Sequence, residues 1–148
     1  MTETNGSSDR ARAALEGIAV GAVAVTTRAL ATPGAELTFA QWRVVVIVGD
    51  DPGGATVTEV AARLGAEISP ASRLVSRLAR RGFIRAGKDP DDRRVTRVTL
   101  TGPGRDLREA VLQRRREMLA DVLNTVGPIA PDVEAALDRI AASLRRYT

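Results

Sequence analysis

The first apolar stretch of the chain follows the helical period. Leu15, Ile18 and Val25 fall on one side of a helix that is expected over residues 9–31. The middle of this helix is apolar on nearly every side, which is typical of a helix buried in a core or in a subunit interface. The preceding residues 1–8 are polar, and we expect them to form a disordered tail.

Two further helices are expected at the end of the chain. Thr101 begins a long helix that stops at the Gly-Pro pair 127–128, and a last helix is expected over residues 131–145. Their apolar residues on one side are Leu107, Val111, Met118, Leu119 and Val122, and then Val133, Leu137, Ile140, Ala141 and Leu144. Because apolar helices flank the middle of the chain from both ends, residues 9–36 and 102–148 are expected to form a dimerisation bundle.

Capping boxes begin two shorter helices in the middle of the chain. In this motif a threonine side chain accepts a hydrogen bond from the backbone N–H three residues later. The Glu or Gln side chain at that later position accepts one from the backbone N–H of the threonine. The two pairs are Thr38 with Gln41 and Thr56 with Glu59. They predict helices over residues 39–48 and 57–64, the second of which ends at Gly65.

A third short helix is predicted to start at Ser69, as its N-cap, and Pro70, and to end at Gly82. Its two sides differ in character. The apolar side holds Ala71, Leu74, Val75 and Leu78, and the polar side holds Ser72, Arg73, Ser76, Arg77 and Arg80. A short helix, a turn with glycine and a second, basic helix are typical of a helix-turn-helix, whose second helix enters the major groove of DNA.

The basic charge is concentrated around this helix. Residues 67–100 hold nine basic and four acidic side chains, a charge of +5, whereas the whole chain carries +4. A local excess of arginine favours an anionic partner such as double-stranded DNA. The alternative is an ordinary solvated helix face, and the segments on either side make it the weaker interpretation.

A β-hairpin is predicted directly after the basic helix. Residues 83–85 and 94–100 read as two strands, and the loop 88–93 contains a proline and three aspartates, which exclude a helix. A hairpin in this position is typical of the wing of a winged helix-turn-helix. The expected fold is therefore mainly α with a small β wing: residues 37–101 form a winged helix-turn-helix, flanked by N- and C-terminal dimerisation helices.

The composition excludes several kinds of chemistry. The chain has 148 residues, enough for one domain with a core, and contains neither cysteine nor histidine. Disulfides, thiol chemistry, histidine acid–base catalysis and most zinc or haem sites are therefore excluded. No nucleophile–base pair and no phosphate-binding loop is visible, so we expect no enzyme, no cofactor and no metal site.

The N-terminal segment has some features of a targeting peptide, with Arg10 and Arg12 before an apolar run. Glu16 interrupts this run, and its apolar part, residues 17–25, is too short to cross a bilayer. We therefore expect a cytoplasmic protein without membrane contact.

Taken together, these segments resemble the MarR (multiple antibiotic resistance regulator) family of bacterial transcription factors. The resemblance is carried by five blocks: LTFAQWRV at 37–44, TEVAARLG at 58–65, SRLVSRLARRGFIR at 72–85, DPDDRR at 89–94, and VTLT at 98–101 with Gly104. It covers nearly the whole order of helices. It implies a homodimer that places two winged modules on adjacent half-sites of a pseudo-palindromic operator.

The resemblance also implies residue roles. Residues of the basic helix would contact DNA in the major groove: Ser69, Ser72, Arg73, Ser76, Arg77 and Arg80. Arg93 or Arg94 at the wing tip would enter the flanking minor groove, with Asp92 bracing them. Many members are repressors that a small, often aromatic, ligand releases from DNA, and here Trp42 and Arg43 are candidates for binding such an effector.

Alternatives remain at two of these points. Trp42 is also the kind of residue that simply fills a core. The second interpretation of the function, after a ligand-released repressor, is a constitutive DNA-binding architectural protein or an activator without a small-molecule effector. Testing release by candidate ligands separates these functions.

Overall fold

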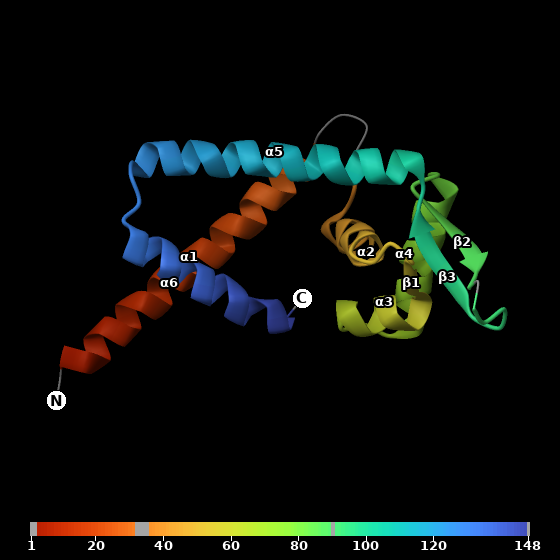
Figure 1. Cartoon of the computed structure of the whole chain (residues 1–148), viewed down its shortest axis with the longest axis horizontal. Helices are drawn as coiled ribbons and strands as arrows, with labels where there is room; N and C mark the ends of the chain where they lie inside the picture. Colours follow the sequence, from red (N-terminus) through yellow and green to blue (C-terminus); the bar gives the residue numbers. More distant parts are fainter. Residues whose placement is uncertain (1–2, 32–35, 90, 148) are drawn as a thin grey trace.

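The protein consists of a helical arm and a compact module that contains a small sheet (Figure 1). The structure is a computed structural model, and it describes residues 3–31, 36–89 and 91–147. The arm contains α1 (Glu3–Leu30), most of α5 (Gly102–Val126), α6 (Pro131–Leu144) and a 3-10 turn, η1 (Arg145–Tyr147). The module contains α2 (Phe39–Gly49), α3 (Val57–Leu64), α4 (Ile68–Arg80) and three strands.

The sheet is antiparallel, with the order β1-β3-β2. It is formed by β1 (Ala55–Thr56), β2 (Ile84–Lys88) and β3 (Thr96–Leu100). Ile84 pairs with Leu100 and Lys88 with Thr96, so the two long strands form the expected hairpin. The two-residue strand β1 was not expected, and it joins the start of α3 to the hairpin. The mainly helical fold with a small β wing is confirmed.

Local capping sets the start of three helices. Thr38 and Thr56 form the predicted capping boxes with Gln41 and Glu59 at the starts of α2 and α3. Thr101 accepts from the backbone of Gly104 at the start of α5. The cap predicted for α4 is wrong: α4 begins at Ile68, its N-cap is Glu67, and Ser69 already lies inside the first turn.

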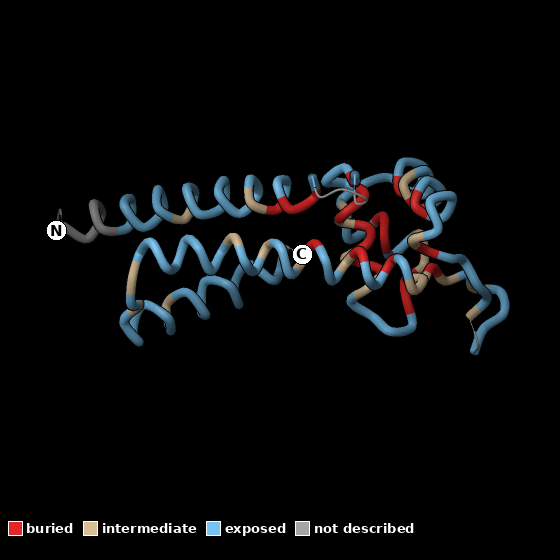
Figure 2. The backbone as a smooth tube through the Cα atoms, turned by 90° about the horizontal axis from the view of Figure 1, so that it is seen from above, coloured by how far each residue is buried: buried red, intermediate tan, exposed pale blue. Residues whose placement is uncertain are grey.

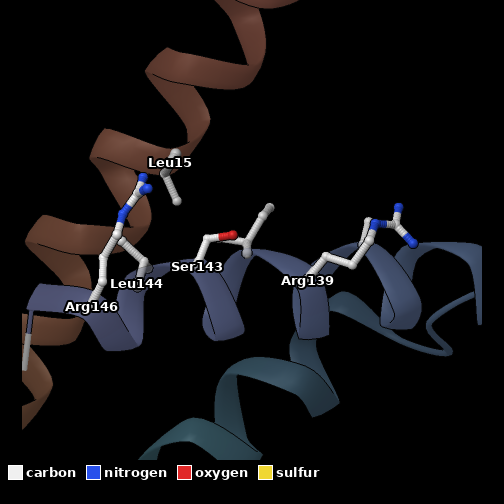
Figure 3. Close-up of a pocket in the computed structure, with 7 residues that line it drawn as sticks. Leu15, Arg139, Ser143, Leu144 and Arg146 are labelled. Atoms are coloured by element: carbon white, nitrogen blue, oxygen red, sulfur yellow. The ribbon is translucent and has the colours of Figure 1, made fainter.

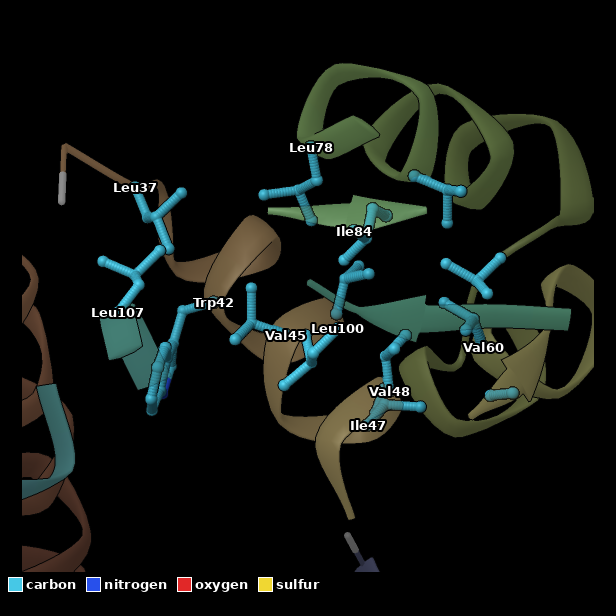
Figure 4. Packing of buried hydrophobic residues seen from close by; sticks show 14 of the residues in the cluster. Leu37, Trp42, Val45, Ile47, Val48, Val60, Leu78, Ile84, Leu100 and Leu107 are labelled. Carbon is cyan, nitrogen blue, oxygen red and sulfur yellow. The ribbon is translucent and has the colours of Figure 1, made fainter. Parts of the chain in front are cut away.

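The core lies within the module and at its junction with the arm (Figures 2 and 4). Val45 and Val48 of α2, Leu78 of α4 and Val98 of β3 are at most 1% exposed. Ala29 and Leu30 at the end of α1, and Leu107 and Val111 of α5, connect the arm to this core. None of the residues of α6 is buried.

α1 differs from the prediction at its start. The helix begins at Glu3, so residues 3–8 are helical where a disordered tail was expected, and residues 1 and 2 lie outside the described part. The segment Ser8–Leu30, with mean hydropathy 1.4, is long and apolar enough to cross a membrane by length and composition. The expectation concerned only residues 17–25, and the longer segment passes where that shorter part would not. The core helix of a soluble protein and an N-terminal signal sequence pass the same test.

Candidate nucleic-acid interface

The surface of α4 that faces solvent carries the residues predicted to contact DNA. Ala71, Val75 and Leu78 are buried against the module. The exposed residues are Ser69, Ser72, Arg73, Ser76, Arg77 and Arg80. In the part of the chain that the structure describes, none of these three arginines pairs with a carboxylate. Their guanidinium groups are therefore free to bind phosphate or base edges.

The end of α4 fixes where the wing begins. Gly82 has a φ of 77°, and its N–H donates to the carbonyl of Ala79, while the N–H of Phe83 donates to the carbonyl of Leu78. This is the Schellman arrangement, which the position of Gly82 in the sequence predicted. It reverses the chain within three residues and sends β2 back along α4 (Figure 1).

The wing tip is a turn that presents two arginines. The N–H of Val95 donates to the carbonyl of Asp92 at 2.9 Å, so Arg93 and Arg94 are the central residues of the turn. Both side chains are exposed. The carboxylate of Asp92 accepts from the backbone N–H of Arg94 at 2.9 Å. Asp92 therefore stabilises the backbone of the tip and does not form an ion pair with the guanidinium of Arg93 or Arg94.

Asp89 is the residue that ties the wing loop together. One of its carboxylate oxygens accepts from the backbone N–H groups of Asp91 and Asp92, at 2.9 and 3.3 Å. The other forms an ion pair with the guanidinium of Arg97. These contacts, Arg97 first, lower the pKa of Asp89, and the same pair raises the pKa of Arg97.

Arg97 also connects the wing to the helix-turn-helix. Its Nη1 donates to the carbonyl of Gly54 at 3.1 Å and lies 3.7 Å from a carboxylate oxygen of Glu59. Glu59 is part of the capping box of α3, and hydrogen bonds from Thr56 are the main reason that its pKa is lowered. A chain of polar contacts thus runs from the start of α3 through Arg97 to the wing loop.

The roles of Asp89 and Arg97 were not predicted from the sequence. Their pairing depends on the hairpin register, in which Gly87 lies opposite Arg97 and the N–H of Asp89 donates to the carbonyl of Val95. A hairpin with this register could have been drawn from the two strand patterns, and it would have placed the carboxylate beside the guanidinium. Among the described residues, no group of three His, Cys, Asp or Glu side chains could hold a metal ion.

Trp42 and Arg43, the candidate effector residues, lie beside a cavity of about 470 Å³. We name it the interhelical cavity. Its lining comes from α1, from α2 and its C-cap residue, from α3 and from α5. The lining residues are Thr26, Phe39, Trp42, Arg43, Val46, Ile47, Asp50, Arg63 and Arg115. Trp42 is only 3% exposed and belongs to the core as well (Figure 4).

Ion pairs fix the rim of the interhelical cavity. Asp50 pairs with Arg63 at 2.7 Å and with Arg108 of α5 at 3.1 Å. Arg43 donates to the carbonyl of Arg63 at 2.7 Å. The cavity therefore has aromatic side chains, Phe39 and Trp42, on its wall. Three arginines and a single carboxylate, that of Asp50, also line it.

The fold and the basic surface define a winged helix-turn-helix DNA-binding protein. Residues 35–95 match the sequence model of the MarR family. Over its winged helix-turn-helix region the chain is therefore similar to the MarR family of transcriptional regulators.

Solved structures share the fold along nearly the whole chain. RV1404 from Mycobacterium tuberculosis is 28% identical, with a TM-score of 0.74 over 93% of this chain and 92% of that one. CouR from Rhodococcus jostii RHA1, solved bound to p-coumaroyl-CoA, is 24% identical, with a TM-score of 0.71 over 93% and 92%.

FabT from Streptococcus pneumoniae, solved in complex with DNA, is 17% identical, with a TM-score of 0.74 over 94% of this chain and 95% of that one. A sequence comparison with curated proteins found no match.

Proposed function

We propose that the protein is a homodimeric transcriptional repressor that binds a pseudo-palindromic DNA operator and is released by a small aromatic ligand. The observation that carries this proposal is the exposed basic side of α4 together with a wing tip that presents two exposed arginines. The proposed function includes no catalytic reaction and no cofactor. The protein would act in the cytoplasm, where its operator is.

In this proposal α4 reads the major groove. Ser69, Ser72, Arg73, Ser76, Arg77 and Arg80 make the contacts there. Arg93 and Arg94 enter the neighbouring minor groove, where negative potential attracts guanidinium groups. Asp92, together with Asp89, holds the turn in shape. The structure of FabT in complex with DNA supports this use of the shared fold.

The dimer would be formed by the arm. Large apolar side chains are exposed along all three of its helices, among them Val20 of α1, Val126 of α5 and Leu144 of α6, which are 71%, 66% and 45% exposed. α1 and α6 also leave a cavity of about 370 Å³, which is lined by Leu15 from α1 and by Leu144 from α6 (Figure 3). A second copy that interlocks its own helices here would cover these surfaces without a membrane.

The effector would occupy the interhelical cavity. Phe39 and Trp42 offer aromatic contacts, and Arg43, Arg63 and Arg115 favour a negative charge. A ligand that pushes α1 and α5 away from α2 would change the distance between the two α4 helices of the dimer. CouR, solved with an aromatic acyl-CoA, supports an aromatic anion as the ligand class.

DNA recognition can be tested with fragments selected from random DNA. The wild-type dimer should prefer the selected sequence to random DNA by about a thousandfold or more. Arg77→Ala should cost about 1–3 kcal/mol at one base position of each half-site and change binding to random DNA little. Arg116→Ala, an exposed α5 arginine paired with Glu109, is the matched control. Equal reductions in affinity for selected and random DNA would make Arg77 a phosphate contact.

Ligand release separates the repressor from the constitutive alternative. Benzoate, 4-hydroxybenzoate and an aromatic acyl-CoA are added to the protein on its selected DNA, and dissociation is followed by fluorescence anisotropy. At least one should dissociate the wild-type complex, and Arg43→Ala should weaken that response. Complexes that resist every aromatic anion would favour a constitutive architectural protein or an activator.

A further inference from the structure

Ile68, at the start of α4, is an exposed apolar residue for which the fold offers no cover. Its side chain is 55% exposed. Within the described residues 36–89 and 91–101, the only other large apolar side chain of this kind is that of Phe39, which lines the interhelical cavity. The exposure of Ile68 therefore does not belong to the core, the cavity or the arm.

Ile68 lies at the border between the two sides of α4, four residues before the exposed Ser72 and seven residues before the buried Val75. Ile68, Ser72 and Ser76 are four residues apart, so they lie one above another along the helix, and all three are exposed. Ile68 is the first residue of α4. The first residues of a recognition helix are those that contact base edges in the major groove.

We propose that Ile68 contacts the methyl group of a thymine in each half-site of the operator. This inference rests on the proposed function. The C5-methyl of thymine is the apolar group that base pairs present in the major groove, and a branched aliphatic side chain can bury it. Such a side chain offers no hydrogen bond to guanine or adenine, so it discriminates by the methyl alone.

The experiment removes single methyl groups from the DNA. In the selected sequence, each dT of the half-sites is replaced in turn by dU, and the affinity of the wild-type dimer is measured by fluorescence anisotropy. At one thymine position per half-site, binding should weaken about fourfold for each methyl removed. Replacement of thymines outside both half-sites should leave the affinity unchanged.

Two variants connect this effect to Ile68. Ile68→Ala should bind thymine and uracil DNA equally at that position, while Ile68→Val, which keeps a branched side chain, should retain most of the difference. Thermal melts of both variants check that the fold is intact. The uracil series with the wild-type protein tests the methyl contact even if a variant does not fold.

Tight, selective binding with no sensitive thymine, or an unchanged thymine preference in Ile68→Ala, would overturn this inference and leave the proposed function in place. A wild-type protein that prefers no sequence would instead overturn the proposed function, and this inference with it.

Discussion

At the scale of single residues, the position of the wing depends on the contacts of Asp89 and Arg97. The ion pair fixes one end of the loop, and Arg97 carries this restraint to Gly54 and Glu59 beside α3. Neither residue is expected to touch DNA. Their effect is to hold Arg93 and Arg94 in one place, so that less conformational freedom is lost when the tip enters a groove.

The charge of Asp89 should make the stability of the wing depend on pH. Since its pKa is lowered in the folded protein, its stabilising effect is complete above its ordinary value near 4 and is lost as the pH falls through the lower, folded value. The melting temperature of Asp89→Asn should therefore be below that of the wild type at pH 7, and this difference should shrink below about pH 4.

A matched control for this series is Asp91→Asn, which removes a charge from the same loop. In the described structure the Asp91 side chain makes no hydrogen bond or ion pair. Its melting temperature should follow that of the wild type from pH 7 to pH 3. A deficit in Asp89→Asn that widens as the pH falls would contradict the assigned role of the carboxylate.

At the scale of elements, the wing should add affinity more than base discrimination. Replacing Arg93 and Arg94 by Ala should weaken operator binding and lower the slope of log affinity against log salt by about 0.9 for each phosphate that is no longer neutralised. Melting should change little, because exposed substitutions usually stay within about 0.5 kcal/mol. Salt titrations with selected and random DNA measure both effects.

An unchanged slope together with an unchanged affinity would show that the wing stays off the DNA. A large fall in melting temperature would instead show that the two arginines are structural.

The first turn of α5 can be tested through its two glycines. A Cβ at Gly104 would lie 1.9 Å from the carbonyl oxygen of Phe83, whereas a Cβ at Gly102 would meet nothing within 4 Å. Gly104→Ala must therefore shift the backbone between α4 and β2, and it should destabilise the protein by about 1–3 kcal/mol. Gly102→Ala is the control and should melt close to the wild type. Equal melting curves would contradict the close packing.

Elements with local signals could be predicted from the sequence. Thr38, Thr56 and Thr101 cap their helices through contacts that span three residues, and Gly82 ends α4 as its position indicated. The residue type of Ser69 suits an N-cap, but the turn after Gly65 is short enough for the helix to begin at Ile68.

Other features depend on contacts between distant segments, so local patterns could not reveal them. Strand β1 is only two residues long and is defined by its pairing with Val98 and Arg97 across the sheet. The ion pair between Asp89 and Arg97 could be found only by pairing the two strand patterns with each other in the observed register, because neither pattern shows it alone. The roles of the DNA-contacting residues stay predictions, as do those of Trp42 and Arg43 in effector binding.

At the scale of the whole molecule, the exposed apolar surface of the arm predicts an obligatory dimer. Deleting residues 131–148 removes Leu137, Ile140 and Leu144 from this surface, and the shortened chain should lose both dimerisation and operator binding. Analytical ultracentrifugation and DNA binding measure the two properties on the same sample. A stable dimer of the shortened chain would show that α6 does not hold the subunits together.

A point variant complements this deletion. Leu137→Glu places a charge on the same face of α6 and keeps the helix, so its dimer should dissociate at higher protein concentrations than that of the wild type. An unaltered dissociation constant would contradict the assignment of this face.

Lys88, at the end of β2, is the single lysine of the chain, and its ammonium group donates to the hydroxyl of Thr96 across the hairpin. Apart from the amino terminus, it is therefore the only primary amine available to acylating reagents. An amine-reactive fluorophore attached there would sit on the wing, close to the turn of Arg93 and Arg94. The protein can thus be labelled at its DNA-binding edge without any engineered cysteine, and the emission of the dye would report when the wing enters a groove.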